Sequence, residues 1–332
     1  MAAALVVAAF VTGAAAGPVR VPLRAVLEAV LSPPFLHSQS AADSGQWAIL
    51  WSLRFPRVVL GALVGGMLAT AGAAYQGVFR NPLADPYLLG AASGAVLGAT
   101  LAIVLAHGST LFGVSPVPVA AFVGASAAVS AAYLVGSSMG DRRNPTTLIL
   151  AGVAIAAFLT AVQAYVQQVQ TDTLRQVYSW IIGRLVTAGW GGVGFTLPQA
   201  ILGVGVIMAH RRLLDALAVG DEEVSSLGVS PRRVRLVVVA AATLCTAAAV
   251  ASAGAIGFVG IIVPHTVRLL LGPSYRVVLP MSFLLGAAFL MLADAAARTV
   301  VSPAELPIGV ITAVVGAPFF LFVMRSRRLR EL

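Results

Sequence analysis

Long apolar stretches separated by short polar turns run along almost the whole chain. A helix that crosses the hydrocarbon core of a bilayer needs about 20 largely apolar residues. Ten stretches approach that length, near 1–16, 58–79, 88–107, 116–138, 147–168, 196–210, 234–253, 255–270, 277–296 and 306–324. The pattern predicts an all-α polytopic membrane protein with about ten transmembrane helices, built as a single transmembrane domain over residues 1–332.

Two of these stretches allow more than one interpretation. The first resembles a secretory signal peptide, because residues 14–16 are similar to a cleavage site, but it lacks the basic residues that begin such a peptide. We therefore expect it to be a first transmembrane helix. The eighth is short and is interrupted by Gly257, Gly260 and Pro264. Discontinuous helices near transport pathways have this pattern, and so does an ordinary kink.

A shorter helical pattern lies between the first two stretches, over residues 22–31. One helical face carries Leu23, Val26, Leu27, Val30 and Leu31. On another face, Arg24 and Glu28 have the i,i+4 spacing of an ion pair. The pattern predicts an amphipathic helix on the external surface of the membrane.

Composition agrees with a membrane protein and excludes several functions. Hydrophobic residues make up 59% of the chain and charged residues 10%, whereas a soluble domain has about 25% charged residues. All 21 basic residues are arginine, so the chain cannot form a P-loop, whose lysine contacts the nucleotide phosphates. Any ATPase must therefore be a separate chain. The net charge of +9 comes without a basic stripe interleaved with aromatic residues, which argues against nucleic-acid binding.

The distribution of arginine predicts the orientation in the membrane. With the N-terminus inside and ten alternating spans, 14 arginines fall on the cytoplasmic side and seven on the outside. Cytoplasmic loops of membrane proteins carry the excess of basic residues. We therefore expect a multi-pass protein of the cytoplasmic (inner) membrane with both termini in the cytoplasm.

Acidic residues and histidines do not form a recognisable catalytic or metal site. The carboxylates fall in predicted loops or near the ends of predicted spans, and the four histidines have no metal-ligand spacing. An enzyme is therefore not expected. An ion-coupled secondary transporter remains the alternative, although such transporters usually keep a carboxylate in mid-membrane. A non-transporting scaffold is disfavoured by the polar motifs described next.

Three polar motifs stand out, and each also has a plain structural interpretation. Residues 54–57 place two arginines at the external mouth of the second span, where they could simply anchor to lipid headgroups. Residues 76–86 end that span in a proline-rich turn, which could be a mere connection. Residues 213–235 form a charged cytoplasmic loop that could be solvated or could bind a partner.

Together these motifs resemble the iron-chelate and vitamin B12 permease family of ABC importers. The resemblance rests on Arg54-Phe55-Pro56-Arg57, Arg80-Asn81-Pro82-Leu83-Ala84-Asp85-Pro86, Leu150-Ala151-Gly152, residues 253–268, residues 304–309 and residues 316–320. These matches occur in order from about residue 47 to 324, so the resemblance covers nearly the whole chain.

The resemblance implies an assembly. Two copies of the permease would form a homodimer with the pathway along its axis, two ATPase subunits would bind below, and one substrate-binding protein would bind above. ATP and Mg²⁺ would sit on the ATPase, so no cofactor is expected on this chain. The cargo would be an iron-siderophore, haem or cobalamin, since importers of all three share these motifs.

The resemblance also implies roles for individual residues. Contacts with the binding protein would come from Arg54, Arg57 and Arg298. The cytoplasmic gate would be formed by Asn81, Leu83, Pro145 and Thr146. The cytoplasmic coupling loop, at about 211–233, would contact the ATPase through Leu217, Gly220, Asp221, Glu222, Leu227 and Gly228.

Overall fold

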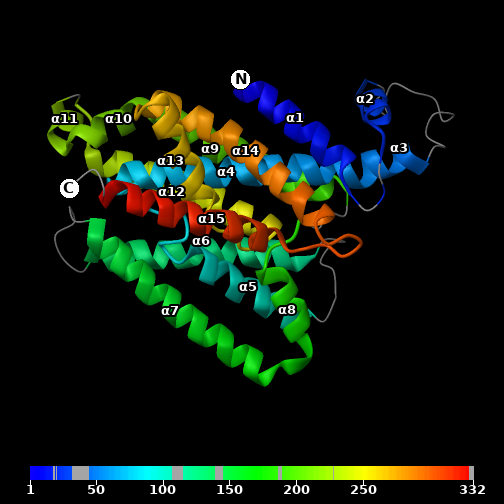
Figure 1. Cartoon of the computed structure of the whole chain (residues 1–332). Helices are drawn as coiled ribbons and strands as arrows, with labels where there is room; N and C mark the ends of the chain where they lie inside the picture. The colour runs from blue at the N-terminus through cyan, green and yellow to red at the C-terminus, as the bar shows by residue number, and fades with distance from the viewer. Residues whose placement is uncertain are drawn as a thin grey trace.

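The computed structural model describes residues 1–17, 19, 21–31, 45–106, 115–138, 145–185, 189–226 and 228–328. Within these ranges every regular element is a helix. The helices form an elongated bundle from which α7 diverges (Figure 1). The all-α prediction is therefore confirmed.

Each predicted apolar stretch corresponds to a helix in the described part of the chain. These helices are α1 (Ala2–Ala15), α4 (Phe55–Phe79), α5 (Ala91–Ala106), α6 (Pro116–Ser138), α7 (Pro145–Val169), α9 (Gly191–Ala209), α12 (Pro231–Ala253), α13 (Val259–Leu271), α14 (Tyr275–Thr299) and α15 (Ile308–Arg328). Among the described residues, six of them are long and apolar enough to cross a membrane, while α1, α5, α13 and the apolar part of α15 (Ile308–Val323) are shorter. The structure thus supports a multi-pass protein, and the count of about ten spans stays a prediction.

The centre of the bundle is α4. In the most apolar 18 residues of the helical segment Gly45–Phe79, which contains α4, 83% of the residues are buried. Helices α9, α12, α13 and α14 pack around α4. Small residues allow this close packing, because a Cβ atom added at Gly65 would lie 2.7 Å from the Cβ of Leu290 and still closer to the carbonyl oxygen of Gly286. This packing fixes the position of the turn that follows α4.

Short helices lie at the two ends of the bundle. They are α2 (Leu23–Leu31), α3 (Gly45–Ile49), the π-helix η1 (Leu50–Arg54), η2 (Thr171–Thr173), α8 (Leu174–Ile181), α10 (Arg211–Val219) and α11 (Asp221–Ser226). Figure 1 shows α10 and α11 at one end, called here the α10 end, and α2, α3 and α8 at the other, the α2 end. The amphipathic helix predicted over 22–31 is confirmed as α2, with the Arg24–Glu28 ion pair at 2.7 Å.

The eighth apolar stretch is only partly helical. Residues 254–257 are not helical, Phe258 has a left-handed backbone with φ of 70°, and α13 then starts at Val259. The helix continues through Gly260 and Pro264. The prediction of an interrupted segment is therefore confirmed at Gly257 and was wrong at the two later positions.

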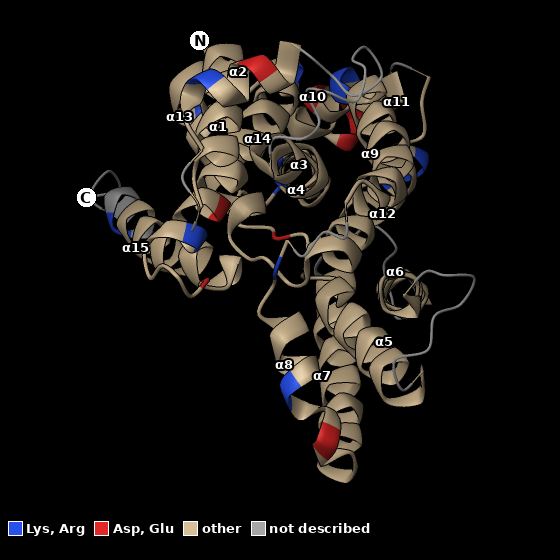
Figure 2. Cartoon of the chain, turned by 90° about the vertical axis from the view of Figure 1, so that its right-hand side faces the viewer, with Lys and Arg blue, Asp and Glu red and all other residues tan. Residues whose placement is uncertain are grey.

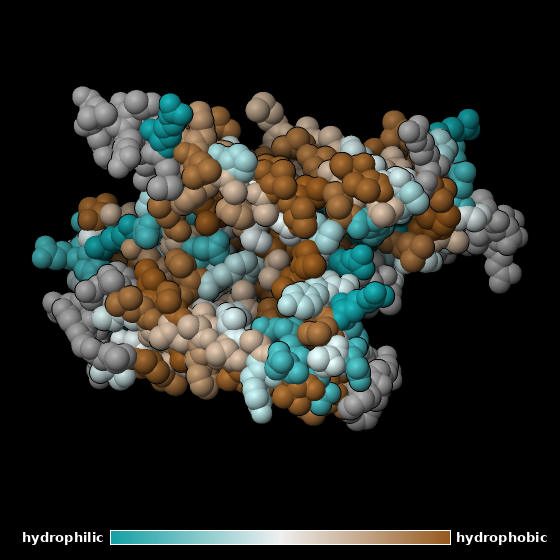
Figure 3. All heavy atoms as spheres, turned by 60° about the horizontal axis from the view of Figure 1, so that its bottom comes forward, coloured by the Kyte–Doolittle hydropathy of each residue, from teal (hydrophilic) through white to brown (hydrophobic). Residues whose placement is uncertain are grey.

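Apolar side chains cover much of the outside of the bundle. Figure 2 shows few charged residues along the helices, and Figure 3 shows apolar side chains over much of one face, interrupted by polar patches. In the most apolar 18 residues of α7, only 17% of the residues are buried. Large side chains such as Leu150 and Phe158 on α7, and Val314 and Leu321 on α15, are more than half exposed. These two helices have apolar surface to cover against lipid or another chain.

Candidate functional site

The turn over residues 80–90, which follows α4, is shaped by its own side chains. Arg80 ends α4 in the left-handed region, with φ of 49°. The Asn81 side chain accepts a hydrogen bond from the N–H of Leu83 at 2.9 Å, and Asp85 accepts one from the N–H of Tyr87 at 2.7 Å. Asx turns of this kind hold a short loop in one conformation. Two of the predicted gate residues, Asn81 and Leu83, therefore lie in an ordered turn.

The same turn is tied to the non-helical segment before α13. Gln76 donates from Nε2 to the carbonyl oxygens of Ala84 at 3.3 Å and Gly260 at 3.0 Å. Tyr87 donates its hydroxyl to the carbonyl oxygen of Ile256 at 2.9 Å and accepts from the N–H of Ile256 at 3.2 Å. The 80–90 turn and residues 254–260 thus form one hydrogen-bonded unit. Sequence analysis placed both segments in motifs but did not connect them.

A cavity of about 440 Å³ lies beside this unit. Its walls are Asp85, Tyr87, Leu88, Val153, Ala156, Gly257, Phe258 and Ile261. Burial raises the pKa of Asp85 to about 6, although the hydrogen bond from Tyr87 works in the opposite direction. Apart from Asp85 and the hydroxyl group of Tyr87 the lining residues are apolar, and the cavity lies between α7, the 80–90 turn and the segment that leads into α13.

Arg80 also connects the turn to the loop between α9 and α12. It donates from Nε to the carbonyl oxygen of Leu217 at 2.7 Å, and its guanidinium group pairs with Asp221. Asp221 in turn accepts from Arg235 on α12 at 2.6 and 3.0 Å. Burial raises the pKa of Asp221, but Arg235 and Arg80 outweigh it and hold that pKa below its ordinary value. We call this set of contacts the Arg80–Asp221–Arg235 link.

The remaining predicted coupling residues lie on and around α10 and α11. Leu217 is fully buried, Gly220 separates the two helices, and Glu222 is exposed. Gly228 has φ of +74°, a backbone conformation that glycine adopts at little cost. Leu227 lies outside the described residues.

The other two predicted gate residues, Pro145 and Thr146, are the first residues of α7, and their side chains lie outside the described part of the structure. The helix that they begin packs on the end of the 80–90 turn. A Cβ atom added at Gly152 would lie 2.8 Å from the Cα of Leu89. The structure therefore places α7 against this turn within one subunit, and a gate at a two-fold axis stays a prediction.

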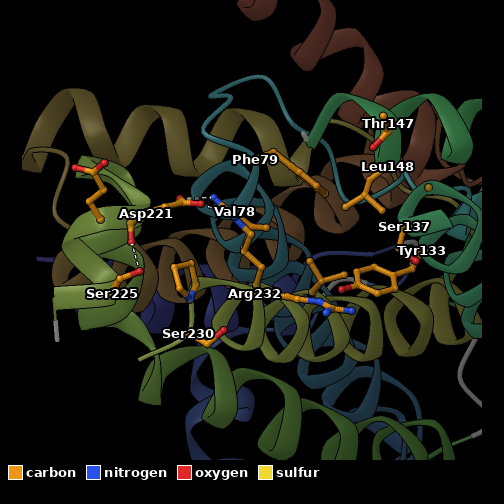
Figure 4. Close-up of a pocket in the computed structure, with 15 residues that line it drawn as sticks. Val78, Phe79, Tyr133, Ser137, Thr147, Leu148, Asp221, Ser225, Ser230 and Arg232 are labelled. Atoms are coloured by element: carbon orange, nitrogen blue, oxygen red, sulfur yellow. Dashed lines mark hydrogen bonds and ion pairs between the residues drawn. The ribbon is translucent and has the colours of Figure 1, made fainter. Parts of the chain in front are cut away.

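A second cavity, of about 620 Å³, lies at the α10 end. Residues from the ends of α4, α6, α7, α11 and α12 line it. Figure 4 shows Asp221 and Ser225 at one side of this cavity and Tyr133 and Ser137 at the other. The cavity thus borders both the Arg80–Asp221–Arg235 link and the start of α7.

At the α2 end, Arg54 and Arg298 hold the C-terminus of α1. Arg54 donates to the carbonyl oxygens of Ala14 at 2.6 Å and Ala15 at 2.8 Å. Arg298 donates to Gly13 and Ala16, both at 2.7 Å. The last carbonyl groups of a helix have no partner within the helix, and cations there also interact favourably with its dipole. Both arginines are therefore used to cap α1.

The third predicted docking arginine, Arg57, belongs to a buried ion-pair network. Asp294, only 1% exposed, lies 2.9 Å from Arg57 and 2.9 Å from Arg298, and Glu305 lies 3.1 Å from Arg57. Arg54 and Arg298 expose 6% and 3% of their surface, so little of either can reach a partner in this conformation. Docking by the three arginines stays a prediction, and burial favours a structural role for two of them. Sequence reasoning missed Asp294.

Comparisons with known proteins agree along almost the whole chain. Residues 5–326 match the FecCD transport family. The cobalamin import system permease protein BtuC of Halobacterium salinarum is 45% identical, over 86% of this chain and 75% of its own. The hemin transport system permease protein HmuU of Yersinia pestis is 39% identical, over 88% of each chain. An inward-facing conformation of a metal-chelate type ABC transporter has a TM-score of 0.78 at 29% identity, covering 92% of this chain and 97% of that chain.

Proposed function

This chain belongs to the FecCD transport family of ABC importer permeases, and we propose that two copies of it form the membrane pathway for a large metal chelate or corrinoid. Relatives named for cobalamin and hemin import support that cargo class. The outward-facing apolar side chains of α7 and α15 support a second copy as the partner of these helices. Membership of this family argues against the alternative, an ion-coupled secondary transporter.

The proposed assembly places a different partner at each end of the bundle. The α10 end faces the cytoplasm, where α10 and α11 contact two ATPase subunits that carry ATP and Mg²⁺. The arginine distribution supports this orientation, with both termini in the cytoplasm of a ten-span protein in the inner membrane. A substrate-binding protein docks at the α2 end, where Arg57 and Glu305 are the partly exposed members of the ion-pair network.

The observation that carries this mechanism is the Arg80–Asp221–Arg235 link. It joins the predicted ATPase-binding helices to the 80–90 turn through side-chain contacts. A gate needs two packing arrangements of similar energy, and a turn held by a few polar contacts can change between them. Movement of α10 and α11 against an ATPase would therefore reposition Asn81 and Leu83 directly.

A crosslink tests the gate. A turn at a two-fold axis meets its own copy, so one cysteine per subunit is enough. With Cys245 replaced by alanine, Leu83→Cys should crosslink two subunits within a complex that co-purifies with its ATPase. The yield should change when the ATPase binds nucleotide. Gly205→Cys is the matched control, because no described atom lies within 4 Å of the Cβ position on that α9 glycine. Equal, background yields at both sites in every nucleotide state would place the turn away from the axis.

A second measurement tests the link. Asp221→Ala removes the carboxylate shared by Arg80 and Arg235, so ATP hydrolysis should continue while cargo uptake per ATP falls about tenfold or more in proteoliposomes. The loss should exceed that in Glu223→Ala, which removes an exposed neighbouring carboxylate outside the predicted coupling residues. Asp221 is charged at neutral pH in the unchanged protein, and because its pKa is lowered further, the link weakens only as the pH falls below the ordinary range of an aspartate. Equal transport-to-hydrolysis ratios in the two variants would contradict this role.

A further inference from the structure

Two cavities meet between α6 and α12. The cavity of about 620 Å³ at the α10 end has already been described. A groove of about 540 Å³ continues from it along the two helices, lined by Ser126, Val129, Ser130, Tyr133, Leu134, Leu236, Val239, Ala240, Thr243 and Leu244. Both cavities share Tyr133 and Val239. The two cavities therefore adjoin, and we treat them as one site with a polar end and an apolar end.

The apolar end opens on the outer surface of the bundle. Leu134 and Leu236, which border the groove, are 68% and 45% exposed. Figure 2, which views the molecule from the α2 end, places α6 and α12 on the side opposite α15. In a multi-pass membrane protein, an apolar groove on this side faces acyl chains.

The polar end of the site carries an unpaired arginine, Arg232, within the described residues. Arg232 is exposed, and no ion pair is found for it among the described residues. The Nε of Arg235 is buried and has no acceptor within the described part of the chain. The nearby carboxylate of Asp221 is already shared between Arg235 and Arg80. An anion in this cavity would therefore pair with Arg232, which is exposed, while the Nε of Arg235 lies beneath the surface.

The side chains around Arg232 suit a phosphodiester. Figure 4 shows Arg232 pointing across the cavity towards Tyr133. Ser230 adds a hydroxyl group to the same walls, whereas the hydroxyls of Ser137 and Ser225 already donate to the carbonyl oxygens of Leu134 and Asp221. Arginine and hydroxyl donors form the charge-assisted hydrogen bonds that bind phosphate oxygens. The other carboxylate on these walls, Glu222, is exposed to solvent.

We propose that this site binds one phospholipid of the leaflet at the α10 end. Its phosphodiester lies at Arg232, and one acyl chain lies in the groove between α6 and α12. The amphipathic order of the site matches that of the lipid along the membrane normal. Basic pockets between transmembrane helices at the membrane surface are known sites for headgroups.

The bound lipid borders the moving parts of the permease. Thr147 and Leu148, next to the predicted gate residues, line the polar end, and so does Asp221 of the link. Occupancy would therefore affect the relative position of α7 and α11. This regulatory role rests on the proposed function, whereas lipid binding itself does not.

Native mass spectrometry of the delipidated permease tests the site, with phosphatidylglycerol titrated into detergent. Arg232→Glu should weaken binding about tenfold, because it removes a charge-assisted hydrogen bond and adds a repulsive charge. Arg233→Glu is the matched control, since Arg233 is also exposed and, in the described part of the chain, lines neither cavity. Ser130→Trp should weaken binding similarly by filling the groove.

Three outcomes would overturn the proposal. Equal affinity in Arg232→Glu and Arg233→Glu would show that Arg232 does not contact the headgroup. Normal affinity in Ser130→Trp would show that no acyl chain lies in the groove. Glycerophosphoglycerol, which lacks acyl chains, should compete poorly, and effective competition would identify a site for soluble phosphates instead. Because binding is measured without ATP or cargo, failure here would leave the Leu83→Cys crosslink and the proposed function untouched.

Discussion

Asp294→Asn should lower the free energy of unfolding by about 3–5 kcal/mol, the range for removing one partner from a buried ion pair. Asp294 is 1% exposed and neutralises two guanidinium groups, those of Arg57 and Arg298. Asparagine keeps the shape of the side chain but leaves Arg298, itself 3% exposed, without its carboxylate. The apparent midpoint of thermal unfolding in detergent should therefore fall by several degrees.

Glu28→Gln provides the control for this prediction. It also removes one carboxylate from an arginine pair, but Arg24 and Glu28 expose 89% and 62% of their side chains. Exposed pairs contribute little because water and salt screen them. The unfolding midpoint of Glu28→Gln should match that of the unchanged protein. If Asp294→Asn melted at the same temperature as Glu28→Gln, the network would not stabilise the α2 end.

Gly72→Ala should be even more damaging, because a single methyl group would enter the backbone of a neighbouring helix. The added Cβ would lie 2.5 Å from the Cα of Gly260 on α13 and closer still to its carbonyl oxygen. Overpacking usually costs about 1–3 kcal/mol when side chains can move, and here only backbone can move. A shift of α13 would also pull the Gly260 carbonyl from Gln76. We expect little folded protein by size-exclusion chromatography.

A matched substitution separates crowding from a general effect of alanine. Gly205 lies inside α9, and no described atom lies within 4 Å of its Cβ position. Alanine favours a helix over glycine by about 0.8–1.0 kcal/mol, so Gly205→Ala should be neutral or stabilising. A normal yield of folded Gly72→Ala would show that α4 and α13 can separate without loss of structure.

Much of the fold could be predicted from hydropathy because lipid imposes a simple condition on each segment separately. An apolar stretch of the right length becomes a helix whatever its neighbours are. The amphipathic pattern of residues 22–31 is local too, and so is the requirement for glycine at Gly228, whose φ is +74°. The interruption before α13 was predicted at Gly257 because it, too, depends on the local sequence. Pro264 was misjudged, because a helix packed among others tolerates proline in its interior.

The site depended on contacts between distant segments, and these have no local signal. Residues 54–57 read as two external cations, yet Arg54 caps a helix about 40 positions earlier in the chain. Asp221 looked like an accessible acidic residue because its loop is charged. Its partner Arg80 is 141 positions away, and only the fold brings the two together. The family resemblance suggested roles for these segments, which stay predictions, and the structure shows the contacts that connect them.

The caps on α1 also set an order of events during synthesis. Arg298 contacts the carbonyl oxygen of Gly13, and the ribosome adds Gly13 to the chain 285 residues before it adds Arg298. At about 5–20 residues per second, that interval is roughly 15 to 60 seconds. During this interval α1 is already inserted, but the carbonyl groups of Gly13 and Ala16 still lack their partner, Arg298 of α14. The C-terminus of α1 is thus capped in two steps, by Arg54 about 40 residues after it is made and by Arg298 only near the end of synthesis.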